Sequence, residues 1–299
     1  MIRYRRSTAT ALLVSGLALC VIGCGRSAAP ERATIQVKGS DTMVNIAQAW
    51  AEEYRNVAPD VDVEVSGGGS GVGIAALIRG TVDVANSSRE MKPAELEQAR
   101  ANTGQEAREF VVGYDALAVY VHKDNPIAEV TLEQLARVFA EDGDFTRWSQ
   151  LGVTLPGTSD DTIVRVSRQS SSGTYEFFRE HVLGVGDFKL GSRDMSGSKE
   201  VVELVGHTLT AIGYSGMGYA TTAVKMIPLA PPGGGPAIAP TVEATLSRAY
   251  PLARSLQVYT LGEPTGDVKQ YVDWILSADG QRILQENGYV PVSAALSGS

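Results

Sequence analysis

Four short segments bring small hydroxyl and glycine residues together at the end of a predicted strand. They are Gly39-Ser40-Asp41-Thr42, residues 67–73 around Ser70, the segment around Ser88, and residues 168–174 with Arg168, Ser172, Gly173 and Thr174. Where a helix follows, its first N–H groups lack intrahelical partners and lie at the positive end of its dipole, so they suit an oxyanion. Hydroxyls add donors that rotate to fit, and glycine permits close backbone approach. Together these segments predict a buried oxyanion site held by neutral donors.

Asp41 is the charged residue of the segment 39–42 and Arg168 that of the segment 168–174, whereas residues 67–73 carry no charge. The planar fork of Arg168 suits two oxygens of a tetrahedral anion. The carboxylate of Asp41 repels an anion unless it accepts a proton from it. Both ionic forms of phosphate near neutral pH carry such a proton, whereas sulfate does not, so Asp41 is predicted to select the protonated anion. The plainer alternatives are a surface ion pair for Arg168 and a capping role for Asp41 on a helix beginning near Met43.

Each segment alone also fits an ordinary helix start, because Ser, Thr and Asp are the preferred N-cap residues. The argument for a site therefore rests on four such segments following strands, where open α/β sheets bind ligands.

The elements that must position these residues alternate between strand and helix patterns, which predicts an α/β fold. Strands are predicted at 35–37, 61–65, 81–85 and 110–122, and a helix carries Ile46, Trp50 and Tyr54 on one face. After residue 122 the pattern starts afresh. Five prolines and three glycines predict a loop at 228–240, and one helix is predicted at 268–285, ending at Gly288. We expect two lobes, residues 34–115 with 256–299 and residues 116–255, joined by chain crossings near 113–117 and 253–258.

The N-terminus resembles a bacterial export signal, with basic Arg3, Arg5 and Arg6 before an apolar stretch at 9–22. Val21-Ile22-Gly23-Cys24 resembles a lipobox, which predicts a lipoprotein signal peptide at 1–23, lipidation of Cys24 and a tether at 24–33. The alternative is an unmodified thiol in an ordinary signal peptide. The apolar run 8–24 is too short for a membrane span. Removal of residues 1–23 takes away three arginines and no acid, so the net charge changes from −8 to −11.

Composition argues against several other classes. A net charge of −8 over 299 residues disfavours nucleic-acid binding. The three histidines lack metal-ligand spacing and the processed chain has no thiol beyond Cys24, so we expect neither a metal, nor a cofactor, nor an enzyme. Residues 71–76 match a dinucleotide-binding fingerprint, but the helix there is too short for that unit.

The sequence resembles the PstS-type phosphate-binding proteins of ABC transporters over about residues 34–292. The motifs that carry the resemblance are Lys38-Gly39-Ser40-Asp41-Thr42-Met43, residues 67–73, 80–89 and 131–135 with Phe139 and Trp148, Arg168 with Ser172-Gly173-Thr174, residues 211–214, and residues 288–291. The resemblance implies a two-lobed periplasmic-binding-protein fold of type II that closes on inorganic phosphate. It also implies permease subunits as partners, a monomer, and a location in the periplasm or on the outer face of the cell membrane.

Carried over by position, the family's phosphate contacts fall here on Asp41, Thr42, Ser70, Arg168, Ser172, Gly173 and Thr174. Ser40 is adjacent to the first of them and is included in the predicted site. Ser88 is the departure, because the best-known members have a phosphate-binding aspartate there. We include Ser88 in the predicted site and expect Asp41 to supply the missing carboxylate. Two alternatives stay open: a receptor for another tetrahedral oxyanion such as sulfate or molybdate, and a phosphate-sensing lipoprotein that feeds no transporter.

Overall fold

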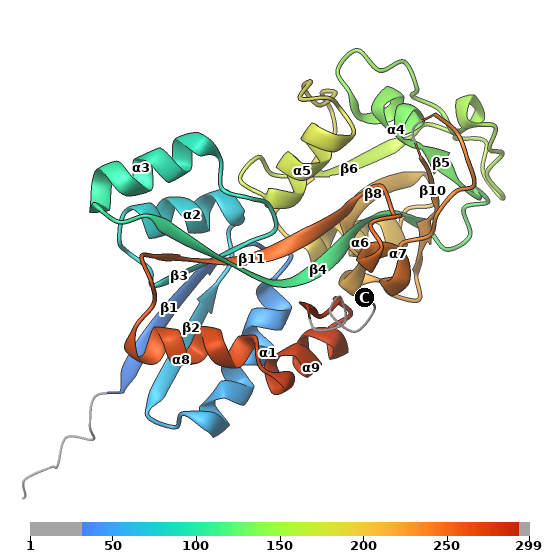
Figure 1. Ribbon diagram of the computed structural model, residues 1–299. Coiled ribbons are helices and arrows are strands. Elements are labelled where there is room, and N and C mark those ends of the chain that lie inside the picture. The colour runs from blue at the N-terminus through green and yellow to red at the C-terminus, as the bar shows by residue number, and fades with distance from the viewer. Residues whose placement is uncertain (1–31, 232, 293–299) are drawn as a thin grey trace, which may run out of the picture. The chain divides into compact units, whose positions relative to one another are not determined.

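The computed structural model describes residues 32–231 and 233–292, over which strands and helices alternate (Figure 1). The strands are β1 (Ala33–Gly39), β2 (Val61–Ser66), β3 (Val84–Ser87), β4 (Ala107–His122), β5 (Val130–Thr131), β6 (Val164–Arg168), β7 (Arg193–Met195), β8 (Ala211–Gly216), β9 (Val224–Ile227), β10 (Leu229–Ala230) and β11 (Ala253–Leu261). The helices are α1 (Val44–Val57), α2 (Ser70–Ile78), α3 (Pro93–Thr103), α4 (Leu132–Phe139), α5 (Gly173–His181), α6 (Ser198–Gly206), α7 (Val242–Leu246), α8 (Gly266–Ile275) and α9 (Ala278–Glu286), with 3-10 turns η1 (Trp148–Leu151) and η2 (Met217–Tyr219). The predicted α/β class is confirmed.

The predicted N-terminal features lie almost entirely outside this part of the chain. The signal peptide 1–23, Cys24 and residues 25–31 of the tether are not among the described residues. Strand β1 already begins at Ala33, the last residue assigned to the tether. Arg32 begins a compact unit that contains all the described residues.

The main sheet has the strand order β2-β1-β3-β11-β4-β8-β6-β7, with β9 paired to β4. Strand β1 runs parallel to β2 and β3, and β6 runs parallel to β7 and β8. Parallel strands bring their carboxyl ends to one edge, where ligands bind in open α/β sheets. The loops that follow Gly39, Ser87 and Arg168 start at such ends.

Strands β4 and β11 cross the middle of the sheet side by side (Figure 1). Strand β4 pairs with β11 from Ala107 to Ala116 and with β8 from Leu117 to Val121, so its partner changes between residues 116 and 117. Successive residues of β4 also enter different hydrophobic clusters, one containing Trp50 and the other Trp148, because side chains alternate between the faces of a strand. The predicted lobe boundaries at 115/116 and 255/256 lie in these two strands and stay a prediction.

Helix α1 shows how periodicity positions the site. Ile46, Trp50 and Tyr54 are all buried, as their spacing predicts. The indole Nε1 of Trp50 donates a hydrogen bond to the carbonyl oxygen of Gly280 at 2.8 Å, which ties α1 to α9. This anchorage holds the segment that carries Ser40 and Thr42 immediately before α1.

The single helix predicted at 268–285 is wrong, because α8 ends at Ile275 and α9 begins at Ala278. Ser277 is the N-cap of α9 and its side chain accepts from the N–H of Gly280. A Cβ on Gly280 would lie 2.5 Å from the carbonyl oxygen of Trp274, so glycine permits the tight turn between the helices. The predicted end of α9 is confirmed, since Gly288 follows the C-cap with a φ of 80°.

Strand boundaries also differ from the sequence expectation. Strand β3 begins at Val84 rather than at residue 81. The segment 228–240 is not entirely loop, because β10 pairs with β5 within it. Two-residue strands carry no periodic signal, so proline and glycine dominate the prediction there.

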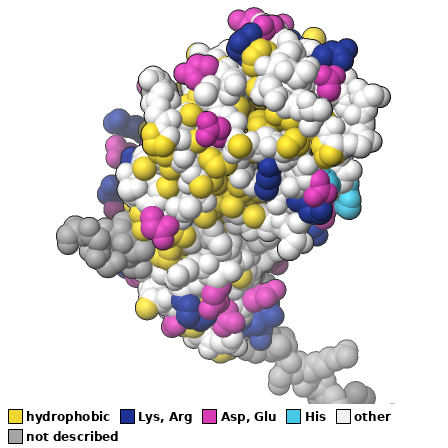
Figure 2. Space-filling model, turned by 90° about the vertical axis from the view of Figure 1, so that its right-hand side faces the viewer, with side chains coloured by type: hydrophobic (Ala, Val, Ile, Leu, Met, Phe, Trp, Pro, Cys, Tyr) yellow, Lys and Arg dark blue, Asp and Glu magenta, His cyan; other side chains and the backbone are white. Residues whose placement is uncertain are grey.

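On the face that Figure 2 shows, charges of both signs are mixed rather than segregated. Acidic and basic side chains lie interspersed on this face, and hydrophobic side chains gather between them. No helix of residues 32–231 and 233–292 is long and apolar enough to cross a membrane.

Candidate functional site

The four predicted segments come together between the strand ends of the sheet. Six hydroxyl side chains from them are buried, at most 2 % exposed: Ser40, Thr42, Ser70, Ser88, Ser172 and Thr174. They belong to the starts of α1, α2 and α5 and to the end of β3. The structure therefore brings the predicted site residues into one buried cluster.

Three serines form one half of this cluster. The Oγ of Ser40 donates to the Oγ of Ser88 at 3.0 Å, and the Oγ atoms of Ser70 and Ser88 are 3.4 Å apart. The backbone N–H of Ser88 donates to the Oγ of Ser70 at 3.1 Å. Ser88 is thus fully buried, with hydroxyl partners on both sides.

Gly173 allows α5 to approach these serines closely. A Cβ at this position would lie 2.3 Å from the Oγ of Ser70 and 2.7 Å from the Oγ of Ser88. Real Cβ atoms do not approach so closely, so any larger residue would push the start of α5 away. The start of α5 can lie this close to Ser70 and Ser88 because residue 173 is glycine.

Two threonines form the other half. The Oγ1 atoms of Thr42 and Thr174 lie 2.8 Å apart and share a hydrogen bond. Ser172 is the N-cap of α5, and its Oγ accepts from the N–H of Thr174 at 3.1 Å. The hydroxyl of Ser172 therefore has a capping role in addition to its place in the predicted site.

Arg168 is fully buried and does not form the surface ion pair considered as its alternative. Its Nη2 donates to the Oδ2 of Asp41 and to the carbonyl oxygen of Ser196, both at 3.0 Å. Its Nη1 donates to the Oγ of Ser198 at 3.0 Å, and its Nε to the carbonyl oxygen of Met195 at 3.3 Å. Burial lowers the pKa of Arg168, and the nearby carboxylate of Asp41 opposes that shift. One N–H of Nη1 has no partner among the described residues.

Asp41 does not cap α1, because Met43 is the N-cap and makes no side-chain cap bond. Its Oδ2 pairs with Arg168, and its Oδ1 accepts from the N–H of Gly68 at 2.8 Å. The side chain is 13 % exposed. Asp41 therefore joins Arg168 to the glycine-rich segment that precedes α2.

Sequence reasoning missed two buried charged residues, Arg254 in β11 and Asp115 in β4, which lie directly opposite each other. The Nη2 and Nε of Arg254 donate to the Oδ2 of Asp115 at 2.7 and 3.0 Å. Arg254 also donates to the Oγ1 of Thr174 at 3.1 Å and to the Oγ1 of Thr42 at 3.3 Å. A lone acid before the apolar run at 116–121 was the signal that could have drawn attention to this pair.

The two buried ion pairs make the charged part of the site formally neutral. Burial raises the pKa of Asp115, and the attraction of Arg254 together with the N–H of Met217 offsets part of this rise. Each arginine faces one carboxylate. An anion in this cluster would therefore be held by oriented N–H and O–H groups rather than by an excess of positive charge.

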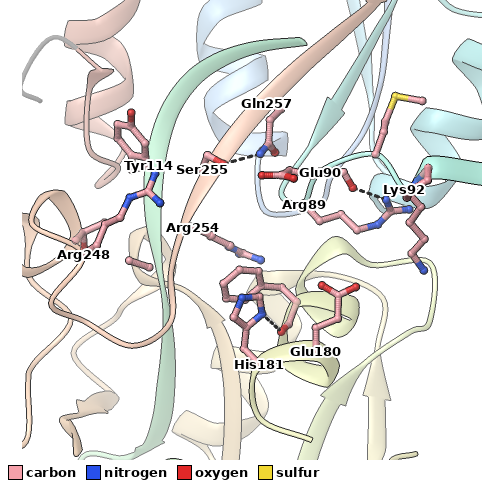
Figure 3. Close-up of a pocket in the computed structure, with 15 residues that line it drawn as sticks. Arg89, Glu90, Lys92, Tyr114, Glu180, His181, Arg248, Arg254, Ser255 and Gln257 are labelled. Carbon is pink, nitrogen blue, oxygen red and sulfur yellow. Dashed lines mark hydrogen bonds between the residues drawn. The ribbon is translucent and has the colours of Figure 1, made fainter. Parts of the chain in front are cut away.

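Arg254 also lines a cavity of about 450 Å³ (Figure 3). Residues preceding and starting α3, the second half of α5 and the first half of β11 contribute to its wall. Arg89 lines it and pairs with Glu95 at 2.7 Å. Lys92 reaches Glu176 of α5 at 2.8 Å. Among the described residues, no group of three or more His, Cys, Asp or Glu side chains is placed to bind a metal ion.

Comparisons with known proteins agree with this geometry. Residues 25–279 match a family model described as a PBP superfamily domain. The phosphate-binding protein PstS of Pseudomonas aeruginosa is 35 % identical over 266 residues, covering 86 % of this chain and 82 % of the relative. The protein of the same name from Bacillus subtilis is 30 % identical over 261 residues, covering 87 % and 81 %.

Two solved structures extend the comparison. A substrate-binding protein from Clostridium perfringens with bound phosphate aligns with a TM-score of 0.75 at 28 % identity, over 87 % of this chain and 99 % of that one. An ABC-type phosphate transport receptor from Vibrio cholerae aligns with a TM-score of 0.67 at 27 % identity, over 86 % and 99 %.

Proposed function

Because this chain belongs to the PstS-type phosphate-binding proteins of the periplasmic-binding-protein superfamily, we propose that it is an extracytoplasmic receptor that binds inorganic phosphate and delivers it to an ABC importer. The predicted two-lobed fold is that of the family. The observation that supports the ligand most directly is the cluster of buried hydroxyls at three helix starts, flanked by two arginines. Tetrahedral oxyanions need many donors from several directions, and this cluster supplies them.

The ligand contacts we propose are those predicted from the sequence. They comprise Ser40, Asp41, Thr42, Ser70, Ser88, Arg168, Ser172, Gly173 and Thr174. The remaining N–H of Arg168 supplies a charge-assisted donor. Asp41 still has acceptor capacity, because each carboxylate oxygen offers two lone pairs and each has one partner here. It is the group proposed to accept the proton of hydrogen phosphate.

The remaining parts of the proposal concern location and partners. The relatives are binding proteins, and catalysis plays no part in the proposed role. We propose a lipid anchor at Cys24 on the outer face of the cell membrane or in the periplasm, supported by the lipobox-like run at 21–24. We propose a monomer that docks with permease subunits.

The first test is isothermal titration calorimetry of the full chain after removal of bound ligand. Phosphate, sulfate and molybdate are titrated at one pH and one ionic strength. We expect tight one-to-one binding of phosphate and no heat from sulfate. Binding of sulfate or molybdate instead would overturn the ligand while keeping the site, and no binding of any of the three would overturn the proposed function.

A further inference from the structure

Arg254 hydrogen-bonds one hydroxyl from each predicted lobe. Thr42 belongs to the first lobe and Thr174 to the second, and their Oγ1 atoms lie 2.8 Å apart. Arg254 donates to both, through Nη2 and Nη1 respectively. Its side chain is 2 % exposed, and that of its partner Asp115 is fully buried. The arginine therefore has a fixed place behind the two hydroxyls.

Arg254, Thr42 and Thr174 form one corner of the site, and the hydrogen atoms there can be assigned from the chemistry of these groups. A guanidinium group only donates hydrogen bonds, whereas a hydroxyl has one hydrogen and two acceptor positions. Arg254 therefore occupies one acceptor position on each threonine and leaves both hydroxyl hydrogens directed elsewhere. One of these hydrogens serves the bond between Thr42 and Thr174. The threonine that accepts this bond has both acceptor positions filled, so its own hydrogen is left for a ligand oxygen that accepts it.

Arg254 has no N–H to spare for the ligand. Two of its five donors go to Asp115 and one to each threonine hydroxyl. The fifth lies 3.4 Å from the carbonyl oxygen of Ser88. In contrast to Arg168, Arg254 must act through the groups that it contacts.

We propose that Arg254, held by Asp115, is a positioning residue that donates to the hydroxyls of Thr42 and Thr174 so that this bonded pair directs one hydroxyl hydrogen toward the ligand. At this corner of the site, that hydrogen is donated to an unprotonated oxygen of the ligand. Such a corner complements Asp41, which is proposed to receive the oxygen that carries the proton. The inference rests on the proposed binding of phosphate.

The test is the variant Arg254→Lys in the full chain, with phosphate affinity measured by calorimetry from below to above the second ionisation of phosphate. Lysine keeps the charge but lacks the planar fork that reaches Asp115 and both hydroxyls together. We expect an affinity loss of at least tenfold where the dianion predominates, and a clearly smaller loss where the monoanion predominates. Arg108→Lys is the control, because Arg108 lies in β4 but is 51 % exposed, and its affinity should not change.

A second substitution distinguishes positioning from general damage. In a Thr42→Val background the effect of Arg254→Lys should shrink, because one of the hydroxyls through which it acts is gone. An Arg254→Lys loss that is equal at every pH and unaffected by Thr42→Val would overturn the inference, and so would no loss at all.

Unpairing the buried Asp115 is costly, so Arg254→Lys can fail to fold. The inference is then tested without this variant. In that case Thr42→Val and Thr42→Ser are compared with Arg254 in place. Thr42→Val should lose more affinity for the dianion than for the monoanion, and Thr42→Ser should restore the wild-type pH profile. Equal losses at all pH values would overturn the inference. Failure of the wild-type chain to bind phosphate would instead overturn the proposed function.

Discussion

At the scale of single residues, the carboxylate of Asp41 makes two hydrogen-bond contacts and is also the group proposed to accept the ligand proton. Its Oδ1 holds the N–H of Gly68, and its Oδ2 faces the buried Arg168. In Asp41→Asn the amide oxygen can still accept one of these bonds, but no carboxylate remains to accept a ligand proton and Arg168 loses its counter-charge. We expect phosphate to lose at least tenfold of its preference over sulfate, measured by calorimetric titration with both anions.

The control for Asp41→Asn is Asp144→Asn, which removes the carboxylate of an exposed ion pair with Arg137. This variant should bind both anions as the wild type does, since exposed pairs contribute little. An unchanged preference in Asp41→Asn would show that another group recognises the protonated oxygen.

The residues that sequence reasoning found and missed differ in their physical signal. Ser70 and Thr174 stand beside glycines at helix starts, a local pattern that can be recognised in the sequence. Arg254 and Asp115 lie within strands, 139 positions apart, and become a pair only through the register between β4 and β11. No local pattern encodes that register, so their contact could not be predicted from the sequence.

At the scale of elements, the position of the first turn of α5 depends on Gly173, which has no side chain. A Cβ on Gly173 would lie 2.3 Å from the Oγ of Ser70. We expect Gly173→Ala to displace the first turn of α5 and to weaken phosphate binding at least tenfold, with a smaller effect on thermal unfolding of the ligand-free protein. Calorimetric titration and a thermal melt measure the two effects.

Gly197→Ala is the control, because Gly197 also lies at a helix start, as the N-cap of α6, and a Cβ there meets only a side-chain atom at 4.0 Å. It should bind phosphate normally. Wild-type affinity in Gly173→Ala would mean that the start of α5 does not approach the ligand.

Periodicity predicted elements well where burial repeats along one face, as in α1 with Trp50 and Tyr54. It failed at the break between α8 and α9, because apolar residues continue across the turn at Ser277 and only the close packing of Gly280 reveals it. Periodicity therefore located α1, whereas the start of α9 depends on a packing contact that the sequence pattern does not show.

At the scale of the whole molecule, contacts between the predicted lobes should govern ligand affinity, and contacts within a lobe should govern stability. The hydroxyl of Tyr219, in the second predicted lobe, donates to the carbonyl oxygen of Asp41 in the first at 2.8 Å. The hydroxyl of Tyr289 donates to the carbonyl oxygen of Thr42 at 2.5 Å, within the first lobe. Both tyrosines are buried and both contact the segment before α1.

These two tyrosines test the lobe boundaries with matched substitutions. If the lobes separate without ligand, water can satisfy both partners of the Tyr219 bond, and its loss is felt only in the closed, ligand-bound state. Tyr219→Phe should then weaken phosphate binding by about fivefold, the worth of one hydrogen bond of about 1 kcal/mol, and leave thermal unfolding of the ligand-free protein unchanged. Tyr289→Phe should lower the stability of the ligand-free protein by a similar amount and leave affinity nearly unchanged. The same response from both variants would place Tyr219 and Asp41 in one rigid body and contradict the proposed division into lobes.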